Sequence, residues 1–126
     1  MDQKNTMESL IEIAEEKPLN KCCYIERSEE GDVTYCIIGH LLRLNGITDE
    51  QLFRLQGDGT ESHIDMLLVH AGNRKLEDKH AQQVLQELEQ AYHRRDLVKI
   101  QHANDFEDRG ELLRLLHKVR NGERLW

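Results

Sequence analysis

Apolar residues recur three or four positions apart over most of the chain, and this spacing places them on one face of a helix. Met7, Leu10, Ile11 and Ala14 show it first. The same spacing continues after residue 36 and predicts helices at 6–17, 37–44, 49–55, 64–71, 76–106 and 111–120. The 76–106 segment is either one long helix or two helices that meet near Arg95-Asp96, with Phe106 extending the apolar stripe.

Strand-forming residues replace the helical spacing at 21–27 and 33–36. The polar segment 28–32, which contains Gly31-Asp32, separates the two runs and is typical of a hairpin loop. The sequence therefore predicts a β-hairpin whose second strand runs directly into a helix, with Cys36 at the junction. Gly39 lies inside that helix, where glycine costs about 1 kcal/mol against alanine. Either another backbone or a ligand comes close to this turn, or Gly39 only lets the hairpin lie flat on the helix.

Polar residues mark where several helices begin. Thr48 followed by Gln51 is a capping box, in which each side chain bonds the other residue's backbone amide. The sequence also offers Asn5 or Thr6 as the cap of the first helix, and Thr60 or Ser62 as the cap of the fourth. Pro18 is expected to end the first helix.

These elements predict an α+β fold that is mainly α-helical, with an N-terminal helix, one β-hairpin and then four to five packed helices. A length of 126 residues suits a single domain, 1–126. Charged residues make up 33% of the chain, but the apolar residues are periodic, so the composition indicates a folded protein.

The net charge of -7 disfavours non-specific binding to nucleic acid, which needs lysine and arginine to neutralise phosphates. Two short helices joined by a glycine-containing turn suggest a helix-turn-helix. However, residues 61–69, the candidate recognition helix, contain no lysine or arginine. We expect no direct nucleic-acid binding. The acidity fits solubility, a basic protein partner or mimicry of a nucleic-acid surface.

The N-terminal decapeptide has no apolar signal core, and no run approaches the ~20 apolar residues that a membrane span needs. We therefore expect no membrane association. Two of the three cysteines are adjacent, which argues against a secreted disulfide framework. The sequence predicts a cytoplasmic protein.

Cysteine and histidine residues provide a weak candidate metal site. Cys22, Cys23, Cys36 and His40 supply ligands that zinc accepts, and His63 or His70 is available as a further ligand. The paired C-x-x-C motifs of most structural zinc sites are absent from the sequence. The alternative is that the cysteines are small buried residues without a chemical role.

The same turn is a weak candidate for cysteine catalysis. A helix N-terminus lowers a thiol pKa, so Cys36 is the candidate nucleophile. His40, four residues later on the same helix face, is a candidate base. His63 and His70 are alternative bases, and Asp65 or Asn73 the orienting group. No glycine-rich oxyanion loop accompanies them.

The run Cys36-Ile37-Ile38-Gly39-His40-Leu41-Leu42 after a predicted strand resembles a C-x-x-G-[HA]-L turn found in small proteins of bacteria and their phages. Gln101 and Asn104-Asp105 are similar to a Q-x-x-N-D element of such proteins. The resemblance covers about half the chain and implies a compact helical accessory protein, without assigning an activity or a site.

The function that these observations favour is a small acidic protein-binding or regulatory protein, of the kind that a phage or mobile element uses to modulate a host protein. Two alternatives stay open. One is a small metal- or thiol-dependent enzyme centred on Cys36 and His40. The other is a helical homo-oligomeric structural protein, such as a homodimer, built on the 76–106 region.

Overall fold

A computed structural model of the chain describes residues 3–21, 23–57 and 63–125. In this part the chain forms seven helices and one two-stranded antiparallel sheet, which confirms the predicted mainly helical α+β fold and its order of elements. Six helices follow the hairpin, where four to five were predicted. The elements in chain order are α1 (Gln3–Glu16), β1 (Ile25–Arg27), β2 (Val33–Tyr35), α2 (Ile37–Leu44), α3 (Asp49–Gly57), α4 (Ile64–Gly72), α5 (Lys79–Ala91), α6 (Arg94–Phe106) and α7 (Arg109–Arg120).

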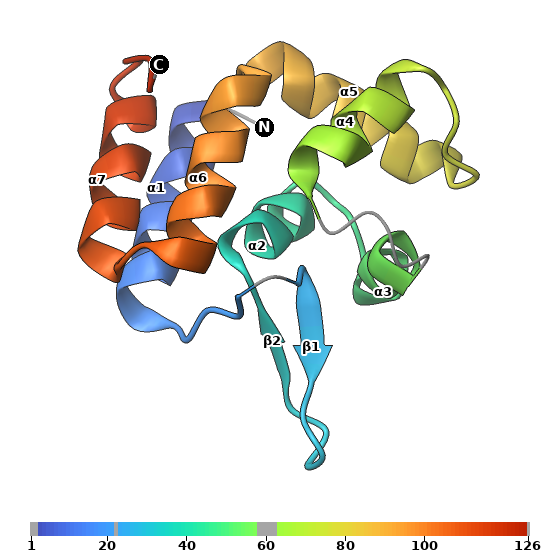
Figure 1. Ribbon diagram of the computed structural model, residues 1–126, viewed down its shortest axis with the longest axis horizontal. Coiled ribbons are helices and arrows are strands. Elements are labelled where there is room, and N and C mark those ends of the chain that lie inside the picture. The colour runs from blue at the N-terminus through green and yellow to red at the C-terminus, as the bar shows by residue number, and fades with distance from the viewer. Residues whose placement is uncertain (1–2, 22, 58–62, 126) are drawn as a thin grey trace.

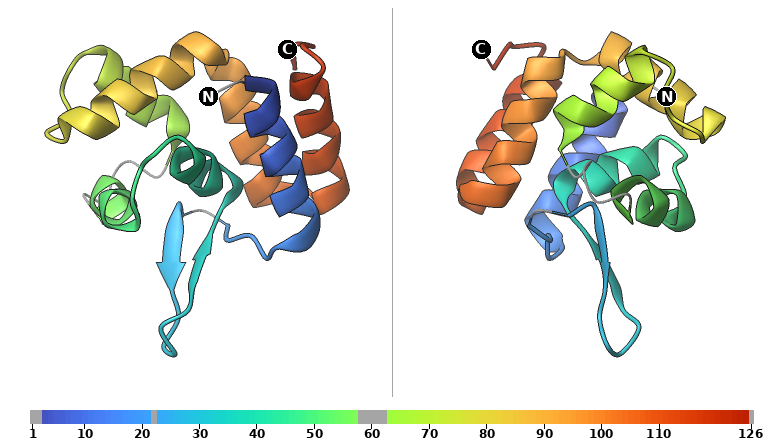
Figure 2. Two further views of the ribbon diagram at one scale, coloured as in Figure 1. Left: turned by 180° about the vertical axis from the view of Figure 1, so that it is seen from behind. Right: turned by 45° about the vertical axis from the view of Figure 1, so that its right-hand side comes forward.

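Helix α2 lies at the centre of the fold (Figure 1). Helices α1, α6 and α7 pack side by side on one side of it, and α4 and α5 pack together on the other side. All residues from Ile37 to Leu42 except His40 are buried, because the apolar positions of this short helix face neighbours on nearly every side. The β1–β2 hairpin projects away from the helical body in every view (Figure 2).

The hairpin has the predicted position and shorter strands. Ile25 pairs with Tyr35 and Arg27 with Val33, so these two pairs share one face of the ribbon. Gly31 has φ +92°, a left-handed backbone conformation that glycine adopts without a steric cost. The glycine therefore fixes the turn that the sequence indicated.

The predicted capping box at α3 is confirmed. The Thr48 amide donates to Gln51 Oε1 at 2.9 Å, and the Gln51 amide donates to Thr48 Oγ1 at 3.1 Å. The predicted cap of the first helix is wrong, because α1 begins at Gln3 and both Asn5 and Thr6 lie inside it. Thr6 is buried in that helix, so it packs within the fold instead of capping.

Helix α4 begins after His63, whose Nδ1 accepts a hydrogen bond from the Asp65 amide at 3.2 Å. The caps that the sequence suggested for this helix, Thr60 and Ser62, lie outside the described residues.

The 76–106 segment is two helices. They meet at Tyr92-His93, two to three residues before the predicted break, because both residues have extended backbone conformations. Phe106 was expected to continue the apolar stripe, and this is wrong. It lies at the end of α6, is 69% exposed and contacts the His102 ring at 5.0 Å between centroids.

Candidate functional site

Cys36 caps the N-terminus of α2 from inside the core. Its extended backbone ends β2, and its Sγ accepts a hydrogen bond from the Gly39 amide at 3.3 Å. The residue is only 1% exposed, and burial raises the pKa of the Cys36 thiol to about 12, although the Gly39 and Ile38 amides act to lower it. Desolvation therefore outweighs the effect of the helix N-terminus, and the thiol is protonated at neutral pH. This environment does not supply the thiolate that cysteine catalysis needs.

His40 is half-buried and directed at the hairpin. Its ring contacts the Tyr35 ring, with 4.8 Å between the centroids. Burial lowers the pKa of His40 to about 4, and the positive charges of Lys17 and Arg43 lower it further. The imidazole is neutral at pH 7. Cys36 and His40 are joined by a backbone hydrogen bond of 3.0 Å, but their side chains contact different neighbours.

The other candidate ligands and catalytic groups are distributed over the fold. Cys23 is half-buried beside the hairpin, where its Sγ donates to Glu26 Oε2 at 3.9 Å. His63 caps the start of α4, His70 lies in its last turn and Asn73 ends it. Asp65, in the first turn, has its Oδ1 3.9 Å from Arg94 Nε. Within 3–21, 23–57 and 63–125, no three His, Cys, Asp or Glu side chains come together as metal ligands. Cys22 lies outside these ranges, so a zinc site that includes it stays a prediction.

Gly39 is the point where the hairpin backbone meets α2. A Cβ atom added there would lie 2.1 Å from the Tyr24 carbonyl oxygen and 3.3 Å from Tyr35 Cβ. The Tyr24 carbonyl also accepts the Cys36 amide at 3.3 Å. The neighbour inferred from the sequence is thus a backbone, and the glycine lets the hairpin lie directly on the helix.

The Q-x-x-N-D element on α6 holds the start of α2 and of α4. Asn104 Oδ1 accepts from the Ile37 amide at 3.0 Å, and its Nδ2 donates to the Asn20 carbonyl at 2.8 Å. Gln101 Oε1 accepts from the Ile64 amide at 2.8 Å. Both side chains are buried, so each satisfies helix-start amides that water does not reach. The two elements that carry the sequence resemblance therefore meet in the structure.

Sequence reasoning missed this structural role of Gln101 and Asn104. A usable signal was present, because residues three apart share one face of a helix. Here that face also carries Leu97 and Ile100, which are buried. Two amide side chains on an otherwise apolar face indicate hydrogen-bonding partners inside the protein.

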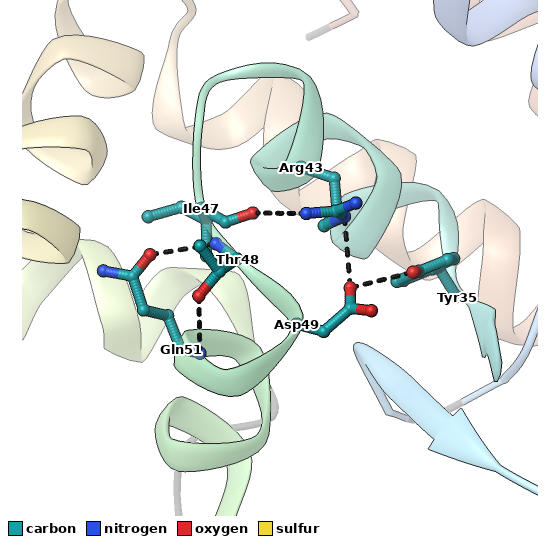
Figure 3. A network of polar contacts seen from close by, with 6 residues as sticks. All are labelled: Tyr35, Arg43, Ile47, Thr48, Asp49 and Gln51. Carbon is teal, nitrogen blue, oxygen red and sulfur yellow. Dashed lines mark hydrogen bonds and ion pairs between the residues drawn. The ribbon is translucent and has the colours of Figure 1, made fainter. Parts of the chain in front are cut away.

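A second polar network fixes the base of the hairpin to α2 and α3 (Figure 3). The Tyr35 hydroxyl donates to Asp49 Oδ1 at 2.8 Å, and Arg43 Nε lies 3.1 Å from the same oxygen. Arg43 also donates to the Ile47 carbonyl at 3.4 Å. Burial and the neighbouring Asp49 carboxylate raise the pKa of Tyr35. The hydroxyl therefore stays protonated and acts as a donor at neutral pH.

The side chain of Gln56 pairs with β1 as a neighbouring strand would. Its Oε1 accepts from the Tyr24 amide at 2.9 Å and the Ile25 amide at 3.1 Å, and its Nε2 donates to the Ile25 carbonyl at 2.6 Å. On the other side, Asn20 donates its amide to the Tyr35 carbonyl at 3.0 Å. Both edges of the hairpin are thus held where it leaves the body.

The outer half of the hairpin carries exposed acidic side chains. Glu26, Glu29, Glu30 and Asp32 are exposed, and Arg27 is the one basic residue among 26–32. No ion pair to these four carboxylates occurs among the residues that the structure describes, whereas Asp49, Glu50, Glu89 and Glu111 are each paired with an arginine. The hairpin therefore carries four exposed carboxylates against one base, on a projection whose base is anchored to the body.

Comparison with known proteins gives no family model that matches the chain, and no curated protein or solved structure matches it. None of the helices in the described ranges has both the length and the apolar character needed to cross a membrane.

Proposed function

We propose that this chain is a non-enzymatic protein-binding protein whose acidic hairpin tip docks on a basic surface of a partner protein. The observation that carries this proposal is the projecting hairpin, with exposed carboxylates at Glu26, Glu29, Glu30 and Asp32 that pair with no base in the described ranges (Figures 1 and 2). Charge complementarity of this kind steers a partner and sets the orientation of docking.

The way in which the hairpin is anchored supports a binding role. Gln56 and Asn20 hold the two edges of the ribbon, and Gly39 allows its backbone to rest on α2. A pre-organised element loses less conformational entropy when it binds than a flexible loop does. The base of the hairpin is thus held in place, and the exposed tip is presented from an anchored position.

We place this interaction in the cytoplasm, following the cysteine pattern of the sequence. The resemblance to small bacterial and phage proteins extends the proposal. In this form, the chain is a phage- or mobile-element-encoded modulator, and the partner is a protein of the host. The hairpin tip is the proposed binding element whether or not the chain is encoded by a phage or mobile element.

The test is affinity capture from bacterial lysate with the intact chain as bait, at low and at high salt. A double variant, Glu29→Lys with Glu30→Lys, reverses two charges at the tip. The matched control, Glu8→Lys with Glu12→Lys, makes the same change in net charge on the exposed face of α1.

We expect the wild-type chain and the α1 control to retain the same partner at low salt, and the tip variant to lose it. High salt should weaken capture because the Debye length falls from about 8 Å at physiological ionic strength to about 3 Å at 1 M, which screens the attraction between exposed charges. A partner that the tip variant retains as well as the control would contradict the proposal, as would the absence of any partner.

A further inference from the structure

The chain contains two Asn-Gly pairs, Asn45-Gly46 and Asn121-Gly122, and in both the asparagine caps the C-terminal end of a helix. In such a pair the backbone nitrogen of the glycine can attack the side-chain carbonyl carbon of the asparagine, because glycine has no side chain that hinders the approach. The two pairs share this chemistry, so only their surroundings can make them differ.

The backbone is nearly the same at the two pairs. Asn45 has φ -97° and ψ 13°, and Asn121 has φ -82° and ψ 3°. Gly46 and Gly122 have φ +96° and +81°, and each donates its amide to a carbonyl in the last turn of the preceding helix, at 3.1 and 3.0 Å. In both pairs the backbone must turn about the asparagine Cα–C bond before the glycine nitrogen reaches Cγ.

Asn45 is locked in place by the fold. The residue is half-buried, and its Nδ2 donates to the Leu41 carbonyl at 2.8 Å. Two positions later, Ile47 is fully buried and donates its amide to the Leu42 carbonyl at 3.0 Å. Turning the backbone at Asn45 would pull Ile47 out of the core, so the folded state blocks the attack.

Asn121 is held less tightly. It ends α7, which lies at the outer edge of the helical body in every view (Figures 1 and 2), and residues 121–124 are exposed. Turning the backbone there breaks the hydrogen bonds that the Gly122 and Glu123 amides make to the last turn of α7. The first buried residue after the pair is Leu125. Bonds at an exposed helix end open far more often than bonds in a core.

The Arg120 side chain favours the reaction at Asn121. Its Nε donates to Asn121 Oδ1 at 3.3 Å, so a positive charge lies beside the oxygen that becomes negative when Cγ is attacked. Asn121 Nδ2, the leaving group, donates no hydrogen bond within 3–21, 23–57 and 63–125. At Asn45 the leaving nitrogen is held by a carbonyl, and the nearby Arg43 is paired with Asp49.

We propose that Asn121 is a site of spontaneous deamidation in the folded protein. The Gly122 nitrogen forms a bond to Asn121 Cγ, the bond from Cγ to Nδ2 breaks, and the proton of the Gly122 amide leaves with Nδ2 as ammonia. The product is a cyclic succinimide. Water then adds to one of its two carbonyl carbons and opens the ring, which leaves aspartate or isoaspartate at position 121. No oxidation or reduction takes place, and water is the one co-reactant.

The modification changes the end of α7. Either product places a carboxylate where the helix dipole is already negative, which is unfavourable. Isoaspartate also adds one carbon atom to the backbone, which moves the Gly122 amide away from the Val119 carbonyl that it now bonds at 3.0 Å. Because α7 packs on α1 and α6, an aged chain should be less stable than a fresh one.

Peptide mapping by mass spectrometry of the purified full chain, incubated at mildly alkaline pH, measures the fraction of amide lost at each pair over time. In the folded chain we expect Asn121 to react at least about tenfold faster than Asn45. In guanidinium, which unfolds the chain, the two rates should agree within about threefold, because neither pair is then held. No partner protein is present, so the result is independent of the proposed role of the hairpin.

Matched variants test the roles of the two side chains. Arg120→Met removes the guanidinium and should slow the reaction at Asn121 about threefold, whereas Lys118→Met removes a charge from the same helix turn and should leave the rate unchanged. Asn121→Gln should remove the reaction at this position. After the same incubation, the wild type should unfold at a lower denaturant concentration than this variant.

Three results would overturn the proposal. The first is a folded chain in which Asn45 reacts as fast as Asn121. The second is a folded chain whose Asn121 stays intact over the time in which the unfolded chain is fully converted. The third is an Arg120→Met protein that reacts as fast as the Lys118→Met control, which would remove the assistance assigned to Arg120.

Discussion

The contact between the hairpin backbone and α2 predicts an unusual response to Gly39→Ala. Replacing a glycine inside a helix by alanine normally stabilises the helix by about 1 kcal/mol. At Gly39 the added Cβ would lie 2.1 Å from the Tyr24 carbonyl oxygen and 3.0 Å from its carbonyl carbon. Both atoms are backbone, so no rotamer change relieves the clash.

The magnitude follows from how far the hairpin must move. Carbon–oxygen contacts lie at about 3.3 Å, so the Tyr24 peptide, which leads into β1, must shift by roughly 1 Å from α2. Overpacking of this kind costs about 1–3 kcal/mol. The hydrogen bond from the Cys36 amide to the Tyr24 carbonyl, at 3.3 Å, weakens as well and removes about 1 kcal/mol. After the helix-propensity gain is subtracted, the expected net loss is about 1–3 kcal/mol of the free energy of unfolding.

Urea denaturation followed by circular dichroism measures this change, provided that the m-value is the same in both proteins. Gly72→Ala is the matched control, because a Cβ at Gly72 would have no atom within 4 Å. We expect this control to be as stable as the wild type or up to about 1 kcal/mol more stable. A Gly39→Ala protein that matches or exceeds the wild type in stability would refute the close approach of the two backbones.

Two further predictions concern buried polar groups. Asn104→Ala leaves the Ile37 amide and the Asn20 carbonyl without their hydrogen-bond partner. The free energy of unfolding, measured by urea denaturation, should fall by about 2–4 kcal/mol. A loss below about 0.5 kcal/mol would show that water satisfies both groups. His40 has a folded-state pKa of about 4 against about 6.5 when unfolded, so its contribution to stability is complete above pH 6.5 and is lost as the pH falls from 6.5 towards 4. Because the ring is partly exposed, we expect this loss to be about 1–2 kcal/mol. In thermal melts recorded over a series of pH values, His40→Phe should lack this pH-dependent loss of stability. If stability falls equally with pH in the variant and the wild type, the prediction is contradicted.

The helices and the hairpin were predictable from the sequence because burial imposes a period on apolar residues. The helical repeat and the change to strand-forming residues at 21–27 and 33–36 gave the element order. The capping box at Thr48 and Gln51 was also predictable, since all its hydrogen bonds join residues three positions apart. Local geometry of this kind does not depend on the rest of the fold.

The environment of Cys36 was not predictable from the same information. Its place at a helix start suggested a lowered pKa, but the thiol points into the core and burial raises its pKa to about 12. Periodicity indicates which face of a helix is buried, and it does not identify the group that covers the first turn. In this fold the side chain of Asn104 meets the first turn of α2. Its Oδ1 accepts a hydrogen bond from the Ile37 amide, 67 positions earlier in the chain.

The long-range bond between Ile37 and Asn104 has a consequence for the order in which a newly made chain acquires its structure. During translation the hairpin and α2 leave the ribosome well before residue 104, 67 positions after Ile37, has been added. Until then the first amide of α2 has no partner inside the protein, and α1 has no α7 to cover it. The nascent chain therefore exposes an incomplete centre for most of its synthesis, and the native core closes only as α6 and α7 emerge.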